Sequence, residues 1–405
     1  MNVAYDAQLA EHLLVRYMQM TSVMVFTALF PPAVKGGGPI RSVEAVVSSH
    51  PKEFTPFVVT SDRDLHEAVP LGVDRNQWTK YEGVSVRYTT LASPVQLFRG
   101  LLAARSVQPE ILYFNSFFTP ALTILPLLLW RVGFWGKPLL LLAPRGEFGG
   151  GALSRRGRKK QLYIRLFRFL RLHRSVMWHA TARHEVDDLR RVWGNDIEVI
   201  LREDQALLPS EPAAPNDFHG EMPRLIFLGR IVEHKGPFIA LEALRHCSKP
   251  ISLDIFGPSE DRAYAAKCEY IAGKLPPHID VKFKGLLEPH EVRSQLALYD
   301  AMLMPTAGEN FGHVIAEALS VSCPVITTPL TPWTELLSGG GGIIVPDRSP
   351  TRWAEAINEF TQLDAHERHA FRLSAADCYR RWCARPSTPH VWVLAVDANQ
   401  RVHTD

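Results

Sequence analysis

The segment Gly308 to Leu319 holds two carboxylates on either side of a turn of small residues. From His313 onward it has the apolar spacing of a helix, so Glu309 falls in the preceding loop and Glu317 about one turn inside the helix. Free amides at a helix start favour phosphate or other anions, and carboxylates accept hydrogen bonds from sugar hydroxyls. The spacing therefore fits a sugar-phosphate site, and it fits an ordinary helix with one capping and one surface glutamate equally well.

A pair of basic residues follows the apolar run Arg224 to Leu228, which predicts a strand. The chain continues with Gly229 and Arg230 and reaches Lys235 five positions later. Open α/β sheets bind ligands at strand ends, where a glycine admits a phosphate close to the backbone. An arginine fork and a lysine charge together suit a diphosphate. The alternative is a surface arginine and lysine beside a turn.

The whole chain has the composition of a globular protein with two domains. Its 405 residues exceed the usual size of one domain, and 46% hydrophobic with 21% charged residues excludes a disordered chain. The net charge of +3 is too small to indicate a partner by itself. The five cysteines lack metal-type spacing, so reduced thiols in a cytoplasmic protein are expected.

Two segments were natural candidates for targeting or membrane insertion. Residues 1–20 lack a basic stretch followed by an apolar core, so no secretory signal is predicted. The apolar stretch Ile111 to Trp130 is interrupted by Asn115, Pro120 and Pro126, which favours a strand plus a helix over a membrane span. We therefore expect a cytoplasmic protein.

Short apolar runs alternate with helical segments in both halves of the chain, which predicts an α/β fold with parallel sheets covered on both faces. The proline-rich stretch 208–216 between the halves reads as a linker. We predict two Rossmann-like domains facing a cleft, at 1–207 and 223–380, with a linker at 208–222 and a C-terminal segment at 381–405. The runs that predict strands are 23–27, 57–60, 111–114, 139–142, 224–228, 251–256, 301–304, 324–327 and 343–345.

Several motifs of the second half occur together in one order. This combination, spanning roughly Arg224 to Pro346, resembles the nucleotide-sugar-binding half of glycosyltransferase family 4, whose members are retaining enzymes of the GT-B fold. The motifs are Phe227-Leu228-Gly229-Arg230, Lys235-Gly236, Phe256-Gly257-Pro258, Lys284-Gly285, Glu309-Asn310-Phe311-Gly312, Glu317-Ala318-Leu319 and Thr331-Pro332-Trp333-Thr334-Glu335-Leu336.

The resemblance implies catalytic roles for three residues. Arg230 and Lys235 neutralise the donor diphosphate in place of a metal ion, and Glu309 contacts hydroxyls of the donor sugar. The departing phosphate takes the acceptor proton during front-face attack, so no protein base is named, and neither a cofactor nor a metal is expected. Other residues implied in donor binding are Gly229, Gly285, Leu286, Asn310, Phe311, Gly312 and the ribose-holding Glu317.

Two segments of the first half match the family more loosely. Gly36-Gly37-Gly38 resembles the glycine-rich loop that approaches the donor phosphates, although a plain flexible loop fits as well. Pro144-Arg145-Gly146-Glu147 stands where the family has a cleft-lining glycine motif, so Arg145 is a candidate positive charge on the acceptor side.

A basic, amphipathic segment spans Ser154 to Arg174 without an acidic residue. Three interpretations are open: a solvated helix packed on the sheet, contact with an anionic membrane surface, and, with least support, nucleic-acid binding. We expect no nucleic-acid partner, and contact through 155–174 would place the protein on the inner face of the cytoplasmic membrane. Its basic residues are Arg155, Arg156, Arg158, Lys159, Lys160, Arg165, Arg168, Arg171 and Arg174.

Other features either lack support as sites or depart from the family. Asp62-Arg63-Asp64 has the spacing of a metal-binding pair, but a surface turn is favoured. Ile200 to Asp204 replaces the family's Asn-Gly turn. Arg385-Pro386 should break any helix, and Pro389 to Val393 reads as extended.

The sequence therefore predicts a retaining, metal-independent glycosyltransferase of the hexosyltransferase type. It would move a sugar from a nucleotide-diphosphate donor to a glycan or lipid-linked acceptor in polysaccharide or glycolipid biosynthesis. The alternatives are a nucleotide-sugar epimerase or hydrolase on the same fold, and a non-catalytic protein that binds sugar nucleotides or glycans.

Overall fold

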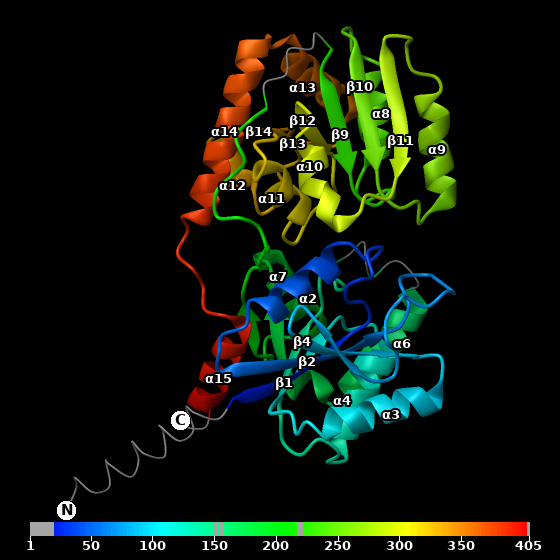
Figure 1. The fold of residues 1–405 in the computed structure, drawn as a ribbon, viewed down its shortest axis with the longest axis vertical. Coiled ribbons are helices and arrows are strands. Elements are labelled where there is room, and N and C mark those ends of the chain that lie inside the picture. The colour runs from blue at the N-terminus through cyan, green and yellow to red at the C-terminus, as the bar shows by residue number, and fades with distance from the viewer. Residues whose placement is uncertain (1–19, 150–152, 154–156, 217–221, 403–405) are drawn as a thin grey trace, which may run out of the picture. The chain divides into compact units, whose positions relative to one another are not determined.

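The computed structural model describes residues 20–149, 153, 157–216 and 222–402. The chain forms two compact units, one made of residues up to Gln205 together with those from Thr388, the other of Ala206–Ser387. Both units are α/β, so the predicted fold class is confirmed (Figure 1). The described part of the proline-rich segment lies on the second unit, because Tyr379 Oη donates to Pro209 O at 2.6 Å and Ala213 N to Ser320 O at 2.8 Å.

The first unit is built on an eight-stranded sheet in the order β3-β4-β2-β1-β5-β6-β7-β8. All neighbouring strands are parallel except β3, which pairs antiparallel with β4. The strands are β1 (Thr21–Thr27), β2 (Phe54–Ser61), β3 (Trp78–Tyr81), β4 (Val84–Thr89), β5 (Ile111–Asn115), β6 (Leu139–Ala143), β7 (Met177–Ala180) and β8 (Val199–Leu201).

Helices cover both faces of this sheet. Residues of α2 (Gly38–Ser48) and α15 (Val391–Val402) share one apolar core with the sheet. The other core contains residues of four further helices, which are α3 (Pro94–Arg105), α4 (Leu125–Arg131), α6 (Gly157–Phe169) and α7 (Arg183–Trp193).

The apolar stretch 111–130 forms β5, a π-helical turn (Pro120–Ile124) and most of α4, as predicted. Across the described ranges, none of the helices has the length and apolar character needed to cross a membrane.

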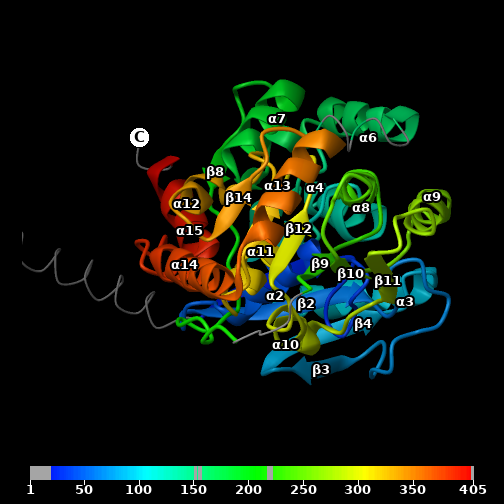
Figure 2. The ribbon, with the colours of Figure 1, turned by 90° about the horizontal axis from the view of Figure 1, so that it is seen from above.

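The second unit has a six-stranded, fully parallel sheet in the order β11-β10-β9-β12-β13-β14 (Figure 2). The strands are β9 (Arg224–Leu228), β10 (Ile251–Phe256), β11 (Ile279–Gly285), β12 (Ala301–Met304), β13 (Val325–Thr327) and β14 (Gly342–Ile344). One core holds α8 (Pro237–Leu244), α9 (Arg262–Ala272) and α13 (Pro350–Gln362), and the other α10 (Val292–Leu296), α11 (His313–Leu319), α12 (Thr334–Ser338) and α14 (Ala365–Cys383).

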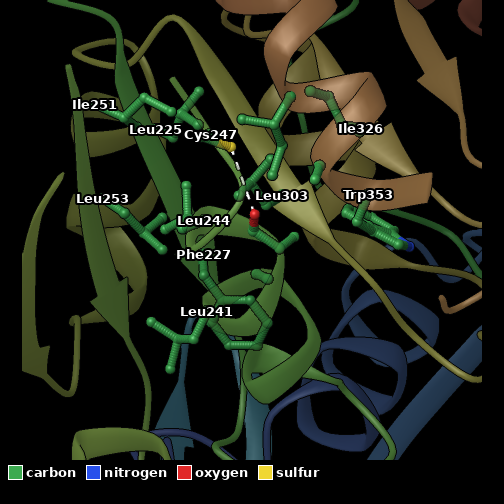
Figure 3. Packing of buried hydrophobic residues seen from close by; sticks show 14 of the residues in the cluster. Leu225, Phe227, Leu241, Leu244, Cys247, Ile251, Leu253, Leu303, Ile326 and Trp353 are labelled. Carbon is green, nitrogen blue, oxygen red and sulfur yellow. Dashed lines mark hydrogen bonds between the residues drawn. The ribbon is translucent and has the colours of Figure 1, made fainter. Parts of the chain in front are cut away.

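The central strands of the second unit are anchored by large apolar side chains. Figure 3 shows Leu225 and Phe227 of β9 in one apolar cluster with Leu241 of α8, Leu303 of β12 and Trp353 of α13. Each of these side chains is at most 1% exposed. Because the sheet is fixed in this way, the loops that leave its carboxyl edge start from defined positions.

The C-terminal segment differs in part from the prediction. The break at Arg385-Pro386 is confirmed, since α14 ends at Cys383. The expectation of extended backbone up to Val393 is wrong, because α15 begins at Val391. Trp392 explains the helix: its fully buried ring packs on Phe54 and Tyr113 of the first unit at centroid distances of 5.7 and 6.4 Å.

His390 ties the start of α15 to helix α2, and we expect this anchor to weaken in acid. Its Nε2 lies 2.9 Å from Val46 O, and its Nδ1 accepts from Trp392 N at 3.3 Å, so the ring must be neutral. Burial lowers the pKa of His390 to about 4, against about 6.5 for an unfolded histidine. The stabilisation is therefore complete above about pH 6.5 and is lost as the pH falls towards 4.

Hydrogen exchange of residues 391–402 at pH 7.5 and 5, corrected for intrinsic rates, measures this effect. We expect lower protection at pH 5 in the wild type and a smaller pH difference in His390→Gln, with the exposed His366→Gln as control. Equal protection at both pH values in the wild type would contradict the role of His390.

Candidate functional site

Four loops of the second unit meet at the carboxyl edge of its parallel sheet. The loop after β9 contacts the end of β10, since Gly229 N donates to Phe256 O at 3.0 Å. Gly257 N, after β10, donates to Gly285 O at 2.8 Å, and Ala307 N, after β12, donates to His234 O at 2.8 Å. Because parallel strands end at one edge, these bonds gather the predicted motifs of β9, β10, β11 and β12 at one place.

Glycines are required where two of these loops touch. Gly257 has φ 142°, and a Cβ there would lie 1.8 Å from Gly229 O. Gly236 has φ 74°, and a Cβ would lie 2.3 Å from Pro305 O. Both positions combine a left-handed backbone with contact between main chains, so a larger residue would force the loops apart.

Lys235 and Glu309, predicted as catalytic, form a close ion pair in this edge. Lys235 Nζ lies 2.6 and 2.8 Å from the two carboxylate oxygens of Glu309, and the side chains are 19% and 11% exposed. Thr306 Oγ1 donates to the same carboxylate at 2.7 Å, while Glu309 N donates to Leu330 O at 3.0 Å. The carboxylate is therefore held by two side chains, and its backbone is fixed to the loop after β13.

Burial and neighbouring charges shift the pKa values of Glu309 and His234. Burial alone would raise the pKa of Glu309, but the charge and hydrogen bond of Lys235 and the hydroxyl of Thr306 hold it below its usual value. The pKa of His234 is lowered, chiefly by burial and also by Lys235, although Glu309 opposes the shift. Near neutral pH the edge thus carries an ionised carboxylate beside an ammonium group and a neutral imidazole.

Arg230 lies at the same edge in a more open setting. Its guanidinium is 3.3 Å from Glu260, and the two side chains are 39% and 21% exposed. An exposed ion pair of this kind contributes little to the stability of the fold. The guanidinium can therefore leave Glu260 for a more highly charged anion at a small cost in free energy. A phosphate group is such an anion.

The remaining predicted donor-binding residues are placed differently from one another. Gly285 ends β11 with φ 76°, and the Leu286 side chain is 39% exposed. Glu317 lies on α11, as predicted, and is half-buried like Asn310. Phe311 is 5% exposed within the apolar core, so only its backbone can face a ligand.

The chain segment at Phe311 and Gly312 is fixed by Trp333. Its Nε1 donates to Phe311 O at 2.6 Å, and its ring packs edge-on against the Phe311 ring at 5.9 Å. Gly312 then turns the chain into α11 with φ 82°. This explains why the Glu309 loop and the Glu317 helix keep a defined spacing.

Sequence reasoning missed three residues that shape the site. Arg348 Nε donates to Pro305 O at 3.0 Å and Nη2 to Glu233 O at 2.7 Å, so it joins the loops after β9 and β12. Nothing in its sequence context points to this role. Thr306 and His234 are close in sequence to Glu309 and Lys235, and that proximity was the only available signal.

The glycine-rich loop of the first unit precedes α2. Gly37 has φ 62° and a Cβ at Gly36 would meet Leu29 Cδ1 at 2.5 Å, so the loop is tightly packed at one glycine and has a left-handed backbone at the next. Asp64 accepts hydrogen bonds from Val34 N at 2.9 Å and Lys35 N at 3.2 Å. The segment Asp62-Arg63-Asp64 thus supplies a carboxylate that positions this loop. The sequence had favoured a plain surface turn here.

Arg145, predicted on the acceptor side, has its donors occupied within the first unit. Its side chain is 4% exposed and forms an ion pair with Asp204. Nε donates to Asn115 Oδ1 at 2.6 Å and Nη2 to Tyr113 Oη at 2.8 Å. We infer that Arg145 fixes the chain at Asp204, just before the second unit begins, and contact with an acceptor remains a prediction.

Residues 212–376 match the family model described as glycosyl transferases, group 1. The matched segment lies within the second unit and includes Arg230, Lys235, Glu309 and Glu317. This segment of the second unit is therefore similar to group 1 glycosyl transferases, which confirms the resemblance expected from the motifs.

Named proteins agree with this assignment. The chain is 27% identical over 197 residues to a D-inositol 3-phosphate glycosyltransferase of Xylanimonas cellulosilytica, covering 44% of this chain and 46% of that protein. It is 28% identical over 223 residues to a phosphatidyl-myo-inositol mannosyltransferase of Mycobacterium leprae, covering 51% and 56%. The chain thus spans about half the length of these curated relatives.

The fold agrees over nearly the whole chain. The crystal structure of Anabaena Alr3699/HepE in complex with UDP and glucose has a TM-score of 0.68 to this chain, with 15% identity, and covers 95% of it and 98% of its own chain. At this identity the similarity establishes the GT-B fold.

Proposed function

We propose that the protein is a retaining glycosyltransferase that moves a sugar from a nucleotide-diphosphate donor to a hydroxyl group of a glycan or lipid-linked acceptor. The observation that carries the proposal is the Lys235–Glu309 pair, which lies with Arg230 at the carboxyl edge of a group 1 glycosyl transferase domain. A buried carboxylate beside an ammonium group and an exchangeable guanidinium suits a ligand with both hydroxyls and phosphates.

The residues divide the donor between them. Arg230 and Lys235 supply positive charge where the diphosphate gains negative charge as the glycosidic bond breaks, and such fixed charges are a large part of many rate enhancements. Glu309, ionised at neutral pH, accepts hydrogen bonds from donor hydroxyls while it orients Lys235. Glu317 on α11 accepts from the ribose, and the exposed Leu286 contacts the base.

This division needs no metal ion, because two cationic side chains carry the charge. It also needs no protein base, because the departing phosphate takes the acceptor proton while the new bond forms on the face that the nucleotide leaves. Retention of configuration follows from that geometry.

The related proteins support the proposed substrates. The Anabaena protein was crystallised with UDP and glucose, and the names of the two relatives specify inositol phosphate and phosphatidylinositol acceptors. These names support our proposal of a glycan or lipid-linked acceptor in polysaccharide or glycolipid biosynthesis.

Release of nucleoside diphosphate from a panel of nucleotide sugars, with and without glycan and glycolipid acceptors, tests the proposal. We expect release that depends on acceptor and persists in EDTA, with the anomeric configuration of the donor kept in the product. Rapid release without acceptor would favour a hydrolase, conversion of the donor without release an epimerase, and binding without turnover a non-catalytic protein.

A further inference from the structure

Helix α6 presents an apolar stripe to solvent. Leu162, Leu166 and Phe169 are 68%, 45% and 82% exposed, and their spacing of four and three residues places them on one side of the helix. Large apolar side chains occur singly on most surfaces, but three on one helix side mark an interaction surface. None of the residues proposed to bind the donor belongs to α6.

The opposite side of α6 is fixed in the first unit. Phe167 is fully buried in the core, and Tyr163 Oη donates to Phe117 O at 2.6 Å. Lys160 lies over the Phe118 ring at 4.7 Å. The orientation of α6 is therefore set by packing, and the apolar stripe cannot turn inward.

Basic side chains flank the stripe on both sides. Viewed down the helix, Arg158 and Arg165 lie on one side of Leu162 and Lys159 on the other. All three are exposed and form no ion pair with any described residue. Further along, Arg174 pairs with Asp196 at 3.1 Å. Arg155 and Arg156, also predicted to belong to this basic segment, lie outside the described residues.

A second helix on the same face of the sheet repeats this pattern. Val95, Phe98 and Leu102 of α3 are 60%, 52% and 42% exposed and again lie on one helix side. Leu101 of α3 and Phe167 of α6 belong to one core, so both helices cover the same face of the sheet (Figures 1 and 2). Helices α3, α4 and α6 together contain no aspartate or glutamate.

We propose that this face of the first unit, defined by the exposed side of α6 with support from α3, binds the surface of an anionic lipid bilayer. A helix with an apolar stripe between basic side chains inserts the stripe among acyl chains and places its charges at the phosphates. Aliphatic Leu162 and Leu166 at the centre of the basic surface disfavour nucleic acid, whose backbone is contacted by cationic and polar groups.

The positive charge of this face favours an anionic bilayer over a partner protein with a neutral surface. Two acids of the neighbouring segment are already paired, Asp188 of α7 with Arg191 and Asp196 with Arg174. Arg158, Lys159 and Arg165 form no ion pair within the described ranges, so their positive charge is available to an external anion. An anionic membrane surface attracts each basic residue near it, so several together give stable binding.

Co-sedimentation of the full chain with phosphatidylcholine vesicles, with and without phosphatidylglycerol, tests the proposal. We expect binding that requires phosphatidylglycerol, weakens in high salt, and falls at least about tenfold in Lys159→Gln/Arg165→Gln. A comparable loss is expected in Leu162→Ser/Phe169→Ser. Because all four side chains are exposed, melting temperatures should stay close to that of the wild type.

Matched controls lie on the second unit. Lys249→Gln/Arg262→Gln removes the same charge from exposed positions, and Tyr270→Ser removes an aromatic ring that is 61% exposed on α9. Both variants should sediment like the wild type.

Three results would overturn the proposal. They are absence of wild-type binding to phosphatidylglycerol vesicles, equal losses in the α6 variants and the controls, and a lipid-independent dimer that the α6 variants dissociate, which would make the face a contact between copies. None of these measurements uses the donor, so the outcome is independent of the proposed glycosyl transfer.

Discussion

Replacing Lys235 with methionine is expected to lower kcat/KM for glycosyl transfer by about a hundredfold or more. The change removes the positive charge proposed to meet the diphosphate, and it also leaves the buried Glu309 without its ion-pair partner. Loss of that partner should raise the pKa of Glu309 because burial then acts unopposed by an ammonium group. Steady-state kinetics with the best donor measure the effect, and KM for the donor should rise while kcat falls.

Two variants make this result specific. Arg230→Ala should cost less, about tenfold, because Arg230 is 39% exposed and its charge acts through solvent. Lys249→Met, an exposed lysine of the same unit, should leave the kinetics unchanged. Kinetics of Lys235→Met and Arg230→Ala within about threefold of the wild type would remove both residues from the diphosphate site.

Replacing Glu309 with glutamine is expected to lower kcat by about a hundredfold while the loop stays in place. Glutamine keeps the size and one acceptor for Thr306, but it loses the charge that holds Lys235 Nζ within 2.8 Å. Lys235 is then free to move from the diphosphate, and the donor hydroxyls lose a charged acceptor. Turnover and donor binding measured together separate these effects.

The pH dependence of the wild type adds a second readout for Glu309. Its pKa is held below the ordinary value of a glutamate, so the carboxylate stays ionised throughout the neutral range, and its contribution is lost only in acid. Donor binding should therefore show no Glu309 titration between pH 6 and 8.

As a control for the Glu309→Gln variant, Glu242→Gln removes a helix-surface carboxylate paired with Arg245 and should not alter turnover. Wild-type turnover in Glu309→Gln would contradict the assignment.

The sequence predicted the most continuously apolar strands, and it missed others, among them the inner strands β4 and β7 of the first unit. Continuous apolar runs such as Leu139–Ala143 are buried on both faces of the sheet and directly indicate parallel strands. The edge strand β3 (Trp78–Tyr81) is half-exposed and mixes polar with aromatic residues, so no periodicity marks it. Helix α15 was missed because Pro389 suggested extended chain, whereas the burial of Trp392 against Phe54 decides the conformation of the residues that follow.

The residue types of the candidate site could be read from the sequence, whereas the contacts between them could not. Glu309 and Lys235 are 74 residues apart, so their contact could be expected only from the parallel topology that brings the ends of β9 and β12 together. Arg145 had the residue type of a ligand-binding group, yet Asp204, 59 positions away, occupies it. Residues that join loops, such as Arg348, do so by contacting carbonyl oxygens. Because every residue has a main-chain carbonyl, such contacts cannot be expected from the sequence.

The central claim is that Arg230, Lys235, Glu309 and Glu317 form one site for a nucleotide-diphosphate sugar. Calorimetric titration of the wild type and of Lys235→Met with a panel of nucleoside diphosphates and their sugars, in EDTA, tests it most directly. We predict that at least one nucleotide binds the wild type without metal and that Lys235→Met weakens this binding at least about tenfold. Equal affinity of both proteins for every nucleotide, or no binding by the wild type, would contradict the account.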